Sequence, residues 1–166
     1  MASRVRLESK IKSPRALAGV LSKLPRSARV VFTNGCFDIL HRGHVSYLER
    51  ARLLGTHLVV ALNGDASVAR LKGPTRPVNP LEDRLRVIAA LEAVSFVTWF
   101  DEDDPVALIT RLKPKVLVKG GDWKPEQILG SREVRSWGGT VRSLAFLEGR
   151  STTAILSRAK TAPRSS

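Results

Sequence analysis

Two histidines and two glycines within one short stretch are the residues of this chain best suited to chemistry. Residues 35–44 read GCFDILHRGH, follow an apolar run at 30–32, and precede a segment, 45–54, with apolar side chains at helical spacing. A turn between a strand and a helix presents free backbone N–H groups and a positive helix end to an anion. Gly35 and Gly43 lack a Cβ and let the backbone approach a ligand closely. The stretch therefore predicts a binding site for nucleotide phosphates.

The histidine pair, His41 and His44, has three interpretations. In the first, both are structural, one as a cap and one packed. In the second, they join Cys36 or Asp38 as zinc ligands, although His57 is the only further histidine in the sequence. In the third, they donate hydrogen bonds, as cations, to a reacting phosphate, because a nearby anion favours protonated imidazole. The glycine-bearing turn favours the third interpretation.

The single cysteine, Cys36, excludes an internal disulfide and is typical of a reducing compartment. A nucleophilic thiol needs an activating base, and the sequence assigns none to Cys36. A small, buried, space-filling side chain is the interpretation that we favour.

Alternating strands and helices position these residues. The predicted strands are 29–34, 57–62, 95–99, 115–119 and 140–146. The predicted helices are 14–24, 44–55, 66–71, 81–92, 105–112 and 151–160, with helical turns at 125–137. Residues 1–12 and the proline-rich 72–80 are predicted to be irregular. This alternation predicts an α/β fold with a doubly wound, five-stranded parallel sheet of order 3-2-1-4-5.

The first and fourth strands are neighbours in a sheet of that order, and ligands bind outside the carboxyl ends of the strands there. The turn after the first strand carries the histidine pair, and the turn after the fourth reads KGGD at 119–122. Two polar, glycine-bearing turns are therefore expected to meet at one crevice.

Proline marks two helix starts. Ser13 and Pro14 read as the N-cap and the first helical residue. The acidic run 101–104, which precedes Pro105, is compatible with a metal site or with a helix cap. We favour capping, with Asp104 as the N-cap, because the helix dipole favours acids at this end.

Length and charge limit the remaining possibilities. The 166 residues predict one folded domain, 28–158, flanked by a basic N-terminal arm with an amphipathic helix, 1–27, and a basic tail, 159–166. Of the net charge of +13, residues 1–29 carry +7 and residues 157–166 carry +3. The excess lies mainly at the ends, and aromatic residues, at 5%, offer little surface for base stacking. We expect no nucleic-acid partner, and a basic nucleic-acid-binding module is the non-enzymatic alternative.

The chain contains no apolar window near the ~18 residues of a membrane span, and its start has no apolar signal region. We therefore expect a cytoplasmic protein with no membrane partner.

Several segments resemble a known family. HRGH at 41–44 resembles the His-x-Gly-His signature of the cytidylyltransferase-like nucleotidyltransferase superfamily, and STTAI at 151–155 resembles its second signature. The segments LKGPTRPVNPLEDR at 71–84, ALEAV at 90–94 and VKGGDWKPE at 118–126 are similar to the D-glycero-β-D-manno-heptose 1-phosphate adenylyltransferases. The similarity extends over about 28–158, with departures at Gly64 and Arg150.

The resemblance implies a Rossmann-like nucleotidyltransferase domain that transfers AMP from ATP to heptose 1-phosphate. Pyrophosphate is released, and ADP-heptose is formed for the lipopolysaccharide inner core. The resemblance also implies a homodimer and Mg²⁺ held largely by phosphates with few protein ligands, so the sequence identifies no metal-binding residue. The preceding kinase step would belong to another protein. The alternative within the superfamily is a cytidylyltransferase that uses CTP and glycerol 3-phosphate.

The chemistry of this reaction suggests roles for the residues. The acceptor phosphate is mostly dianionic at neutral pH, since its second pKa is about 6, so a strong base and a covalent nucleophile are unnecessary. Alignment and positive donors at the α-phosphate and the leaving pyrophosphate are needed instead. We assign His41 and His44 to the ATP phosphates, and by resemblance Lys72 completes the catalytic set.

The other site residues follow from position and resemblance. The predicted nucleotide-binding residues are Thr33, Asn34, Gly35, Phe37, Asp38, Gly43, Lys119, Gly120, Asp122, Ser151, Thr152 and Thr153. The predicted sugar-phosphate residues are Asn63, Asp65 and Arg76. The alternative for Lys72 and Arg76 is that they only solubilise a loop, and residues 151–153 are at minimum a helix cap.

Overall fold

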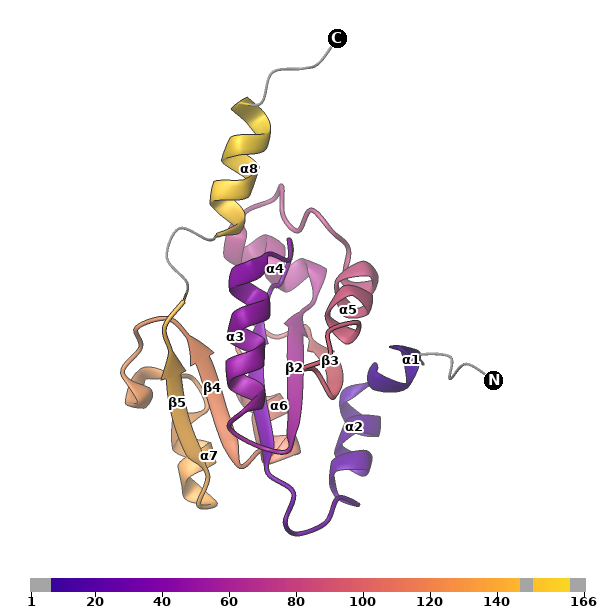
Figure 1. Ribbon diagram of the computed structural model, residues 1–166, viewed down its shortest axis with the longest axis vertical. Helices are drawn as coiled ribbons and strands as arrows, with labels where there is room; N and C mark the ends of the chain where they lie inside the picture. The colour runs from indigo at the N-terminus through magenta and orange to yellow at the C-terminus, as the bar shows by residue number, and fades with distance from the viewer. Residues whose placement is uncertain (1–6, 147–150, 162–166) are drawn as a thin grey trace.

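A five-stranded parallel sheet forms the centre of the protein in a computed structural model that describes residues 7–146 and 151–161 (Figure 1). The strands are β1 (Val30–Gly35), β2 (His57–Asn63), β3 (Phe96–Phe100), β4 (Val116–Gly120) and β5 (Thr140–Leu144). Their order is β3-β2-β1-β4-β5, and each neighbouring pair is parallel. The predicted doubly wound sheet of order 3-2-1-4-5 is confirmed.

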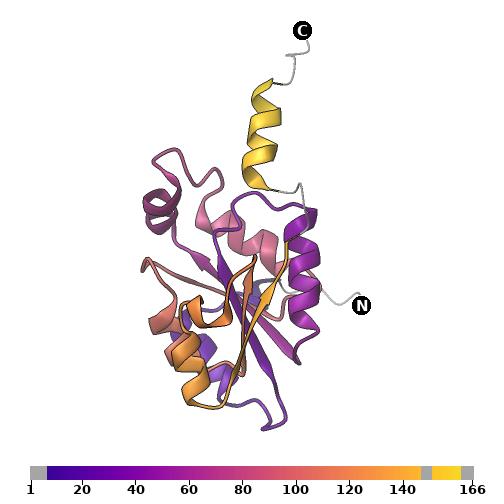
Figure 2. The same ribbon diagram turned by 90° about the vertical axis from the view of Figure 1, so that its left-hand side faces the viewer.

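Helices cover both faces of the sheet, as the buried strands of a parallel sheet require. They are α1 (Leu7–Lys10), α2 (Pro14–Leu21), α3 (Arg42–Arg52), α4 (Asp65–Lys72), α5 (Leu81–Ala89), α6 (Val106–Leu112), α7 (Ser131–Ser136) and α8 (Thr152–Thr161), with a 3₁₀ turn, η1 (Pro125–Gln127). Figure 2 shows α3 and α7 on opposite sides of the sheet, and α8 projecting beyond the carboxyl ends of the strands.

The core has two layers because successive side chains of a strand point to opposite faces. Val31 packs with α3 and α5 in one cluster, whereas Phe32 packs with α2, α6 and α7 in the other. Both side chains are fully buried, and the turn that follows them is thereby held at the carboxyl edge of the sheet.

The N-terminal segment differs from its prediction. Residues 7–10 form one helical turn instead of irregular chain, and Ile11 pairs with Val97 as an isolated parallel bridge. The backbone N–H of Lys12 donates to the Val97 carbonyl at 2.9 Å. The reason is the edge of the sheet, because β3 would otherwise expose unpaired backbone groups. Helix α2 follows with the predicted Ser13 cap and buries Leu17 completely.

The acidic run before α6 acts as a cap, one residue out of the predicted register. Helix α6 begins at Val106, with Pro105 in the N-cap position. The Asp104 carboxylate accepts the backbone N–H of Val106 at 2.9 Å, so it still satisfies a free donor of the first turn. Across the described residues, no three His, Cys, Asp or Glu side chains gather to hold a metal ion, and no helix could cross a bilayer.

Candidate active site

The turn between β1 and α3 holds the histidine pair. His41 is the N-cap of α3 with extended backbone, and the helix begins at Arg42, earlier than predicted. Phe37 has a left-handed backbone (φ 44°), and its ring lies against Gly35. A Cβ at position 35 would come within 3.0 Å of the Phe37 ring. A side chain at position 35 would therefore require the Phe37 ring to move by a few tenths of an ångström.

The two imidazoles stack on each other. The ring centroids of His41 and His44 are 3.8 Å apart, with 21° between the planes, and Phe37 lies 5.1 Å from His44. Burial, and secondarily the neighbouring His41, lowers the pKa of His44 to about 4, against the opposing effect of the Ile39 carbonyl. His44 is therefore neutral near pH 7 without ligand, and the predicted cationic form requires an anion beside it.

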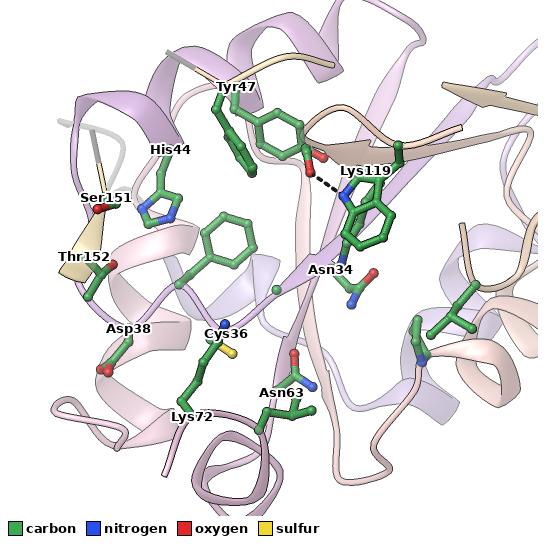
Figure 3. Close-up of a pocket in the computed structure, with 18 of the residues that line it drawn as sticks. Asn34, Cys36, Asp38, His44, Tyr47, Asn63, Lys72, Lys119, Ser151 and Thr152 are labelled. Atoms are coloured by element: carbon green, nitrogen blue, oxygen red, sulfur yellow. Dashed lines mark hydrogen bonds between the residues drawn. The ribbon is translucent and has the colours of Figure 1, made fainter. Parts of the chain in front are cut away.

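A cavity of about 650 Å³ opens at the carboxyl ends of the strands (Figure 3). Most of the predicted site residues line it: Asn34, Gly35, Phe37, Asp38, His41, His44, Asn63, Lys72, Arg76, Lys119, Gly120, Ser151, Thr152 and Thr153. They come from the end of β1 and the β1–α3 turn, the ends of β2, α4 and β4, the loop after α4, and the start of α8. The expected convergence of the two glycine-bearing turns is therefore observed.

Four predicted residues do not line the cavity. Thr33 is fully buried, and its hydroxyl shares a 2.7 Å hydrogen bond with that of Tyr47. Gly43 is buried in the first turn of α3. Asp65 pairs with an arginine of α5. Asp122 is exposed outside the cavity wall.

The charge of the cavity suits a polyanion. Lys72, Arg76 and Lys119 line it, and burial lowers the pKa of Lys119. The two lining acids are already paired, Asp38 with Arg76 and Asp103 with Arg70. Lys72 and Lys119 therefore face the cavity without a carboxylate partner among its lining acids, whereas Arg76 shares its charge with Asp38.

Part of the cavity wall is apolar and aromatic. Trp123, Ile128, Leu129 and Phe146 line the cavity, in the segments that follow β4, η1 and β5. Gly120 lets the Phe146 ring lie against β4, because a Cβ there would overlap the ring. The indole Nε1 of Trp123 donates to the Gly120 carbonyl at 3.1 Å. An aromatic wall together with cationic side chains in one cavity suits a nucleoside joined to phosphates.

Cys36 is half-buried in the cavity wall. Burial raises the pKa of its thiol, although Lys72 and the other nearby cations act in the opposite direction. The thiol stays protonated at neutral pH, which favours the space-filling interpretation over a nucleophile. The zinc interpretation has no support among the described residues.

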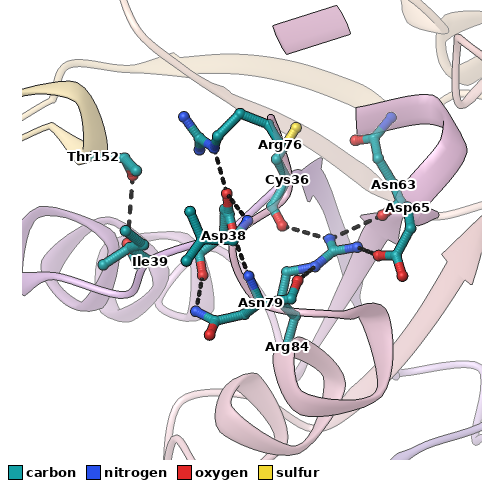
Figure 4. Close-up of polar contacts among 10 residues, drawn as sticks. Cys36, Asp38, Ile39, Asn63, Asp65, Arg76, Asn79, Arg84 and Thr152 are labelled. Carbon is teal, nitrogen blue, oxygen red and sulfur yellow. Dashed lines mark hydrogen bonds and ion pairs between the residues drawn. The ribbon is translucent and has the colours of Figure 1, made fainter. Parts of the chain in front are cut away.

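Asp38 holds the loop that follows α4 (Figure 4). Its carboxylate accepts Nε of Arg76 at 2.6 Å and the backbone N–H groups of Val78 and Asn79 at 2.9 Å. Burial alone would raise the pKa of Asp38, but the hydrogen bonds from Asn79, Val78 and Arg76 outweigh it and lower the pKa. The acceptors of Asp38, predicted to meet a nucleotide, are thus occupied by the loop.

Arg84 on α5 was missed by the sequence analysis. Its side chain is fully buried and contacts three backbone carbonyls and the Asp65 carboxylate (Figure 4). A signal was available, because Arg84 lies on the stripe of Leu81 and Ile88, where an apolar residue is expected.

The start of α8 closes the cavity. The Ser151 hydroxyl accepts the backbone N–H of Ala154 at 3.1 Å, which confirms the predicted cap. The Thr152 hydroxyl donates to the Ile39 carbonyl at 3.5 Å and so links α8 to the histidine turn. Of the two departures, Arg150 lies outside the described residues. Gly64 is the N-cap of α4 and does not line the cavity, and the Asp101 carboxylate occupies the place that a side chain would take.

The sequence of the chain is similar to a known protein family and to individual proteins. The family profile of the cytidylyltransferase-like proteins matches residues 32–158. The bifunctional protein HldE of Hahella chejuensis is 59% identical over 130 residues, which are 78% of this chain and 27% of that protein. The HldE protein of Geotalea uraniireducens is 51% identical over 155 residues, 93% of this chain and 32% of that protein. The chain thus spans about a third or less of the length of these relatives.

Solved structures agree on the fold. A lipopolysaccharide core biosynthesis protein from Thermoplasma volcanium is 29% identical with a TM-score of 0.60, covering 74% of this chain and 99% of that one. The pantoate-β-alanine ligase of Francisella tularensis has a TM-score of 0.61 over 93% of this chain and 73% of its own. At 14% identity, the ligase shares the fold alone.

Proposed function

Because the chain belongs to the cytidylyltransferase-like family, we propose that it is a nucleotidyltransferase that transfers AMP from ATP to D-glycero-β-D-manno-heptose 1-phosphate. The observation that carries the proposal is the convergence of the histidine pair, the turn after β4 and the start of α8 on one cationic cavity. The choice of heptose rests on the resemblance of the loops at 71–84 and 118–126, and the similarity to the HldE proteins supports it.

The proposed reaction exchanges one phosphoanhydride bond for another. An oxygen of the sugar phosphate bonds to the α-phosphorus of ATP, the bond from that phosphorus to the bridging oxygen breaks, and pyrophosphate leaves. The acceptor is already mostly anionic at neutral pH, so the protein need not remove a proton. Its contribution is alignment and stabilisation of the charge that develops on the leaving group.

The cavity suggests how the substrates lie. The aromatic wall of Trp123 and Phe146 takes the base, which leaves the triphosphate along the histidine pair and the N-terminus of α8. Lys72 then completes the catalytic set beside the reacting phosphates, and Arg76 binds the sugar phosphate. In this arrangement His44 gains a proton as the triphosphate binds, because an adjacent anion stabilises imidazolium.

Mg²⁺ fits this site as a companion of the nucleotide. The carboxylates that line the cavity, Asp38 and Asp103, are paired with arginines, so neither is free to form a carboxylate cage. We infer that phosphate oxygens supply most of the ligands, as is usual for this ion. When bound, Mg²⁺ would neutralise part of the charge on the leaving pyrophosphate.

The product, ADP-heptose, would serve the lipopolysaccharide inner core, and the similarity to a lipopolysaccharide core biosynthesis protein supports this assignment. We also propose that the protein forms a homodimer, is located in the cytoplasm and has no nucleic-acid partner.

A panel of substrates tests the proposal. Pyrophosphate release is measured with ATP, CTP, GTP and UTP, each with heptose 1-phosphate, mannose 1-phosphate or glycerol 3-phosphate. The proposal expects the highest kcat/KM for ATP with heptose 1-phosphate. A higher value for CTP with glycerol 3-phosphate would establish the alternative, and no release with any pair would remove the enzymatic assignment.

A further inference from the structure

We propose that Arg84 is a positioning residue that fixes the cavity-lining segments relative to one another, so that its loss lowers turnover more than nucleotide binding. The inference rests on the proposed function for its kinetic consequence. The fixing of these segments by one guanidinium is tested separately by hydrogen–deuterium exchange, which needs no substrate.

The Arg84 guanidinium reaches four acceptors on separate stretches of chain (Figure 4). Its Nε donates to the Asn79 carbonyl at 3.0 Å. Its Nη1 donates to the carbonyls of Cys36 and Asn63, at 2.8 Å and 2.9 Å. Its Nη2 meets the Asp65 carboxylate at 2.6 Å. One planar group thus ties together the turn after β1, the end of β2, the start of α4 and the loop before α5.

Each tied segment carries part of the cavity wall or holds a residue that does. Cys36 precedes the histidine turn, and the Asn63 side chain lines the cavity. Asn79 is held in turn by Asp38, whose carboxylate also holds Arg76. Loss of the guanidinium would therefore free the segments that carry the histidine pair and Arg76 to move relative to each other. Displacement of reacting groups by about 1 Å can cost ~10²-fold in rate.

Arginine is the side chain that this arrangement requires. Its planar fork offers five N–H donors in fixed directions, whereas a lysine ammonium is a single point with three. The side chain of Arg84 is 0% exposed, and its ionic partner, Asp65, is 48% exposed. The hydrogen bond to the Asn63 carbonyl is buried, whereas the other three contacts are partly buried. A lysine in place of Arg84 could not reach all four acceptors, and a buried carbonyl left without its donor is costly.

The kinetic test compares two arginines of α5. Arg84→Lys keeps the positive charge and removes the planar guanidinium. Because misaligned groups slow the reaction, kcat is expected to fall about 10- to 100-fold. The KM for ATP is expected to change less than about threefold. Arg86→Lys is the matched control, because Arg86 is exposed and pairs with Glu8 on the surface. The control is expected to retain wild-type kcat and KM. Wild-type kcat in folded Arg84→Lys would overturn the proposal.

Hydrogen–deuterium exchange separates positioning from failure of the proposed function, since it needs no substrate. Peptides that cover 36–44 and 73–80 are expected to exchange faster in Arg84→Lys than in the Arg86→Lys control. Unchanged exchange in both peptides would overturn the positioning role, even if the substrate panel fails.

A second variant covers the case in which Arg84→Lys does not fold. Asp65→Asn keeps an acceptor for Nη2 and removes its charge at a half-exposed site. The expected result is a smaller fall in kcat, about two- to tenfold, with the same two peptides exchanging faster. Unchanged kcat and exchange in folded Asp65→Asn would then count against the proposal.

Discussion

The Asp38 carboxylate and the Arg76 guanidinium form an ion pair of 2.6 Å in the wall of the cavity, with Asp38 almost fully buried. The same carboxylate accepts the amides of Val78 and Asn79, so it fixes both the side chain and the backbone of the loop. The loop brings Arg76 to the cavity wall, although Arg76 and Asp38 are 38 residues apart in the chain.

Asp38→Ala is expected to release that loop and leave the turn after β1 folded. The KM for the sugar phosphate should rise about tenfold or more, since Arg76 loses its charge-assisted partner and its fixed direction. The KM for ATP should change less. Steady-state kinetics with each substrate varied separately measure the difference. An equal rise in both KM values would place Asp38 at the nucleotide, as the sequence alone predicted.

His44→Ala is expected to fold normally and to lose about 10²–10³ in kcat, the usual effect of removing one donor to the transition state. Circular dichroism and the thermal midpoint check the fold, and pyrophosphate release gives the rate. Lys160→Ala, on the exposed last turn of α8, serves as the control. Turnover of His44→Ala at the wild-type rate would remove the histidine from the mechanism.

The general architecture was predictable because its signals are local. Apolar runs separated by Gly55 and by the loop at 72–80 mark the strands and helices, and a parallel sheet has few topologies. The meeting of the histidine turn with Gly120 follows from strand order alone.

Contacts between distant segments were not predictable. The hydrogen bond from Arg84 to Cys36 joins residues 48 positions apart, and that from Asn79 to Asp38 joins residues 41 positions apart. The local spacing of apolar residues therefore gives no indication of either contact. The helical turn at residues 7–10 was missed for the same reason, because it leads directly into the pairing of Ile11 with β3. The stacking of His41 on His44 also needs coordinates, since spacing indicates only a shared side of the helix.

The depressed pKa of His44 predicts a pH dependence of stability. Its pKa is about 4 in the folded protein against an ordinary 6.5, so the unfolded chain binds more protons between these values. The contribution of His44 to stability is therefore complete above pH 6.5 and is lost as the pH falls towards 4. Urea unfolding at pH 7.5 and pH 5 should show a smaller loss of stability for His44→Gln than for the wild type. An identical loss in both proteins would contradict the buried, neutral imidazole.

Cys36→Ser tests whether the Cys36 thiol takes any part in the reaction. The half-buried thiol has a raised pKa and no nucleophilic part in the proposed reaction, so kcat should stay within about threefold of wild type. Alkylation of wild-type Cys36 should instead abolish activity by filling the cavity, and ATP should slow it. A loss of about 10³-fold in Cys36→Ser would show that the sulfur takes part in the chemistry.

Leu17→Ala tests whether α2 belongs to the folding unit or to a dispensable arm. Leu17 is fully buried against the face of the sheet covered by α6, and its removal should leave a cavity costing about 2–5 kcal/mol in the free energy of unfolding. Val20→Ala on the same helix, where the side chain is half-buried, should cost less. Both are measured by urea unfolding. Because the active cavity lies at the carboxyl edge and Leu17 does not line it, kcat at 25 °C should be unchanged in either variant. A Leu17→Ala protein as stable as the wild type would mean that the domain begins after α2, at the boundary near residue 28 that the sequence indicated.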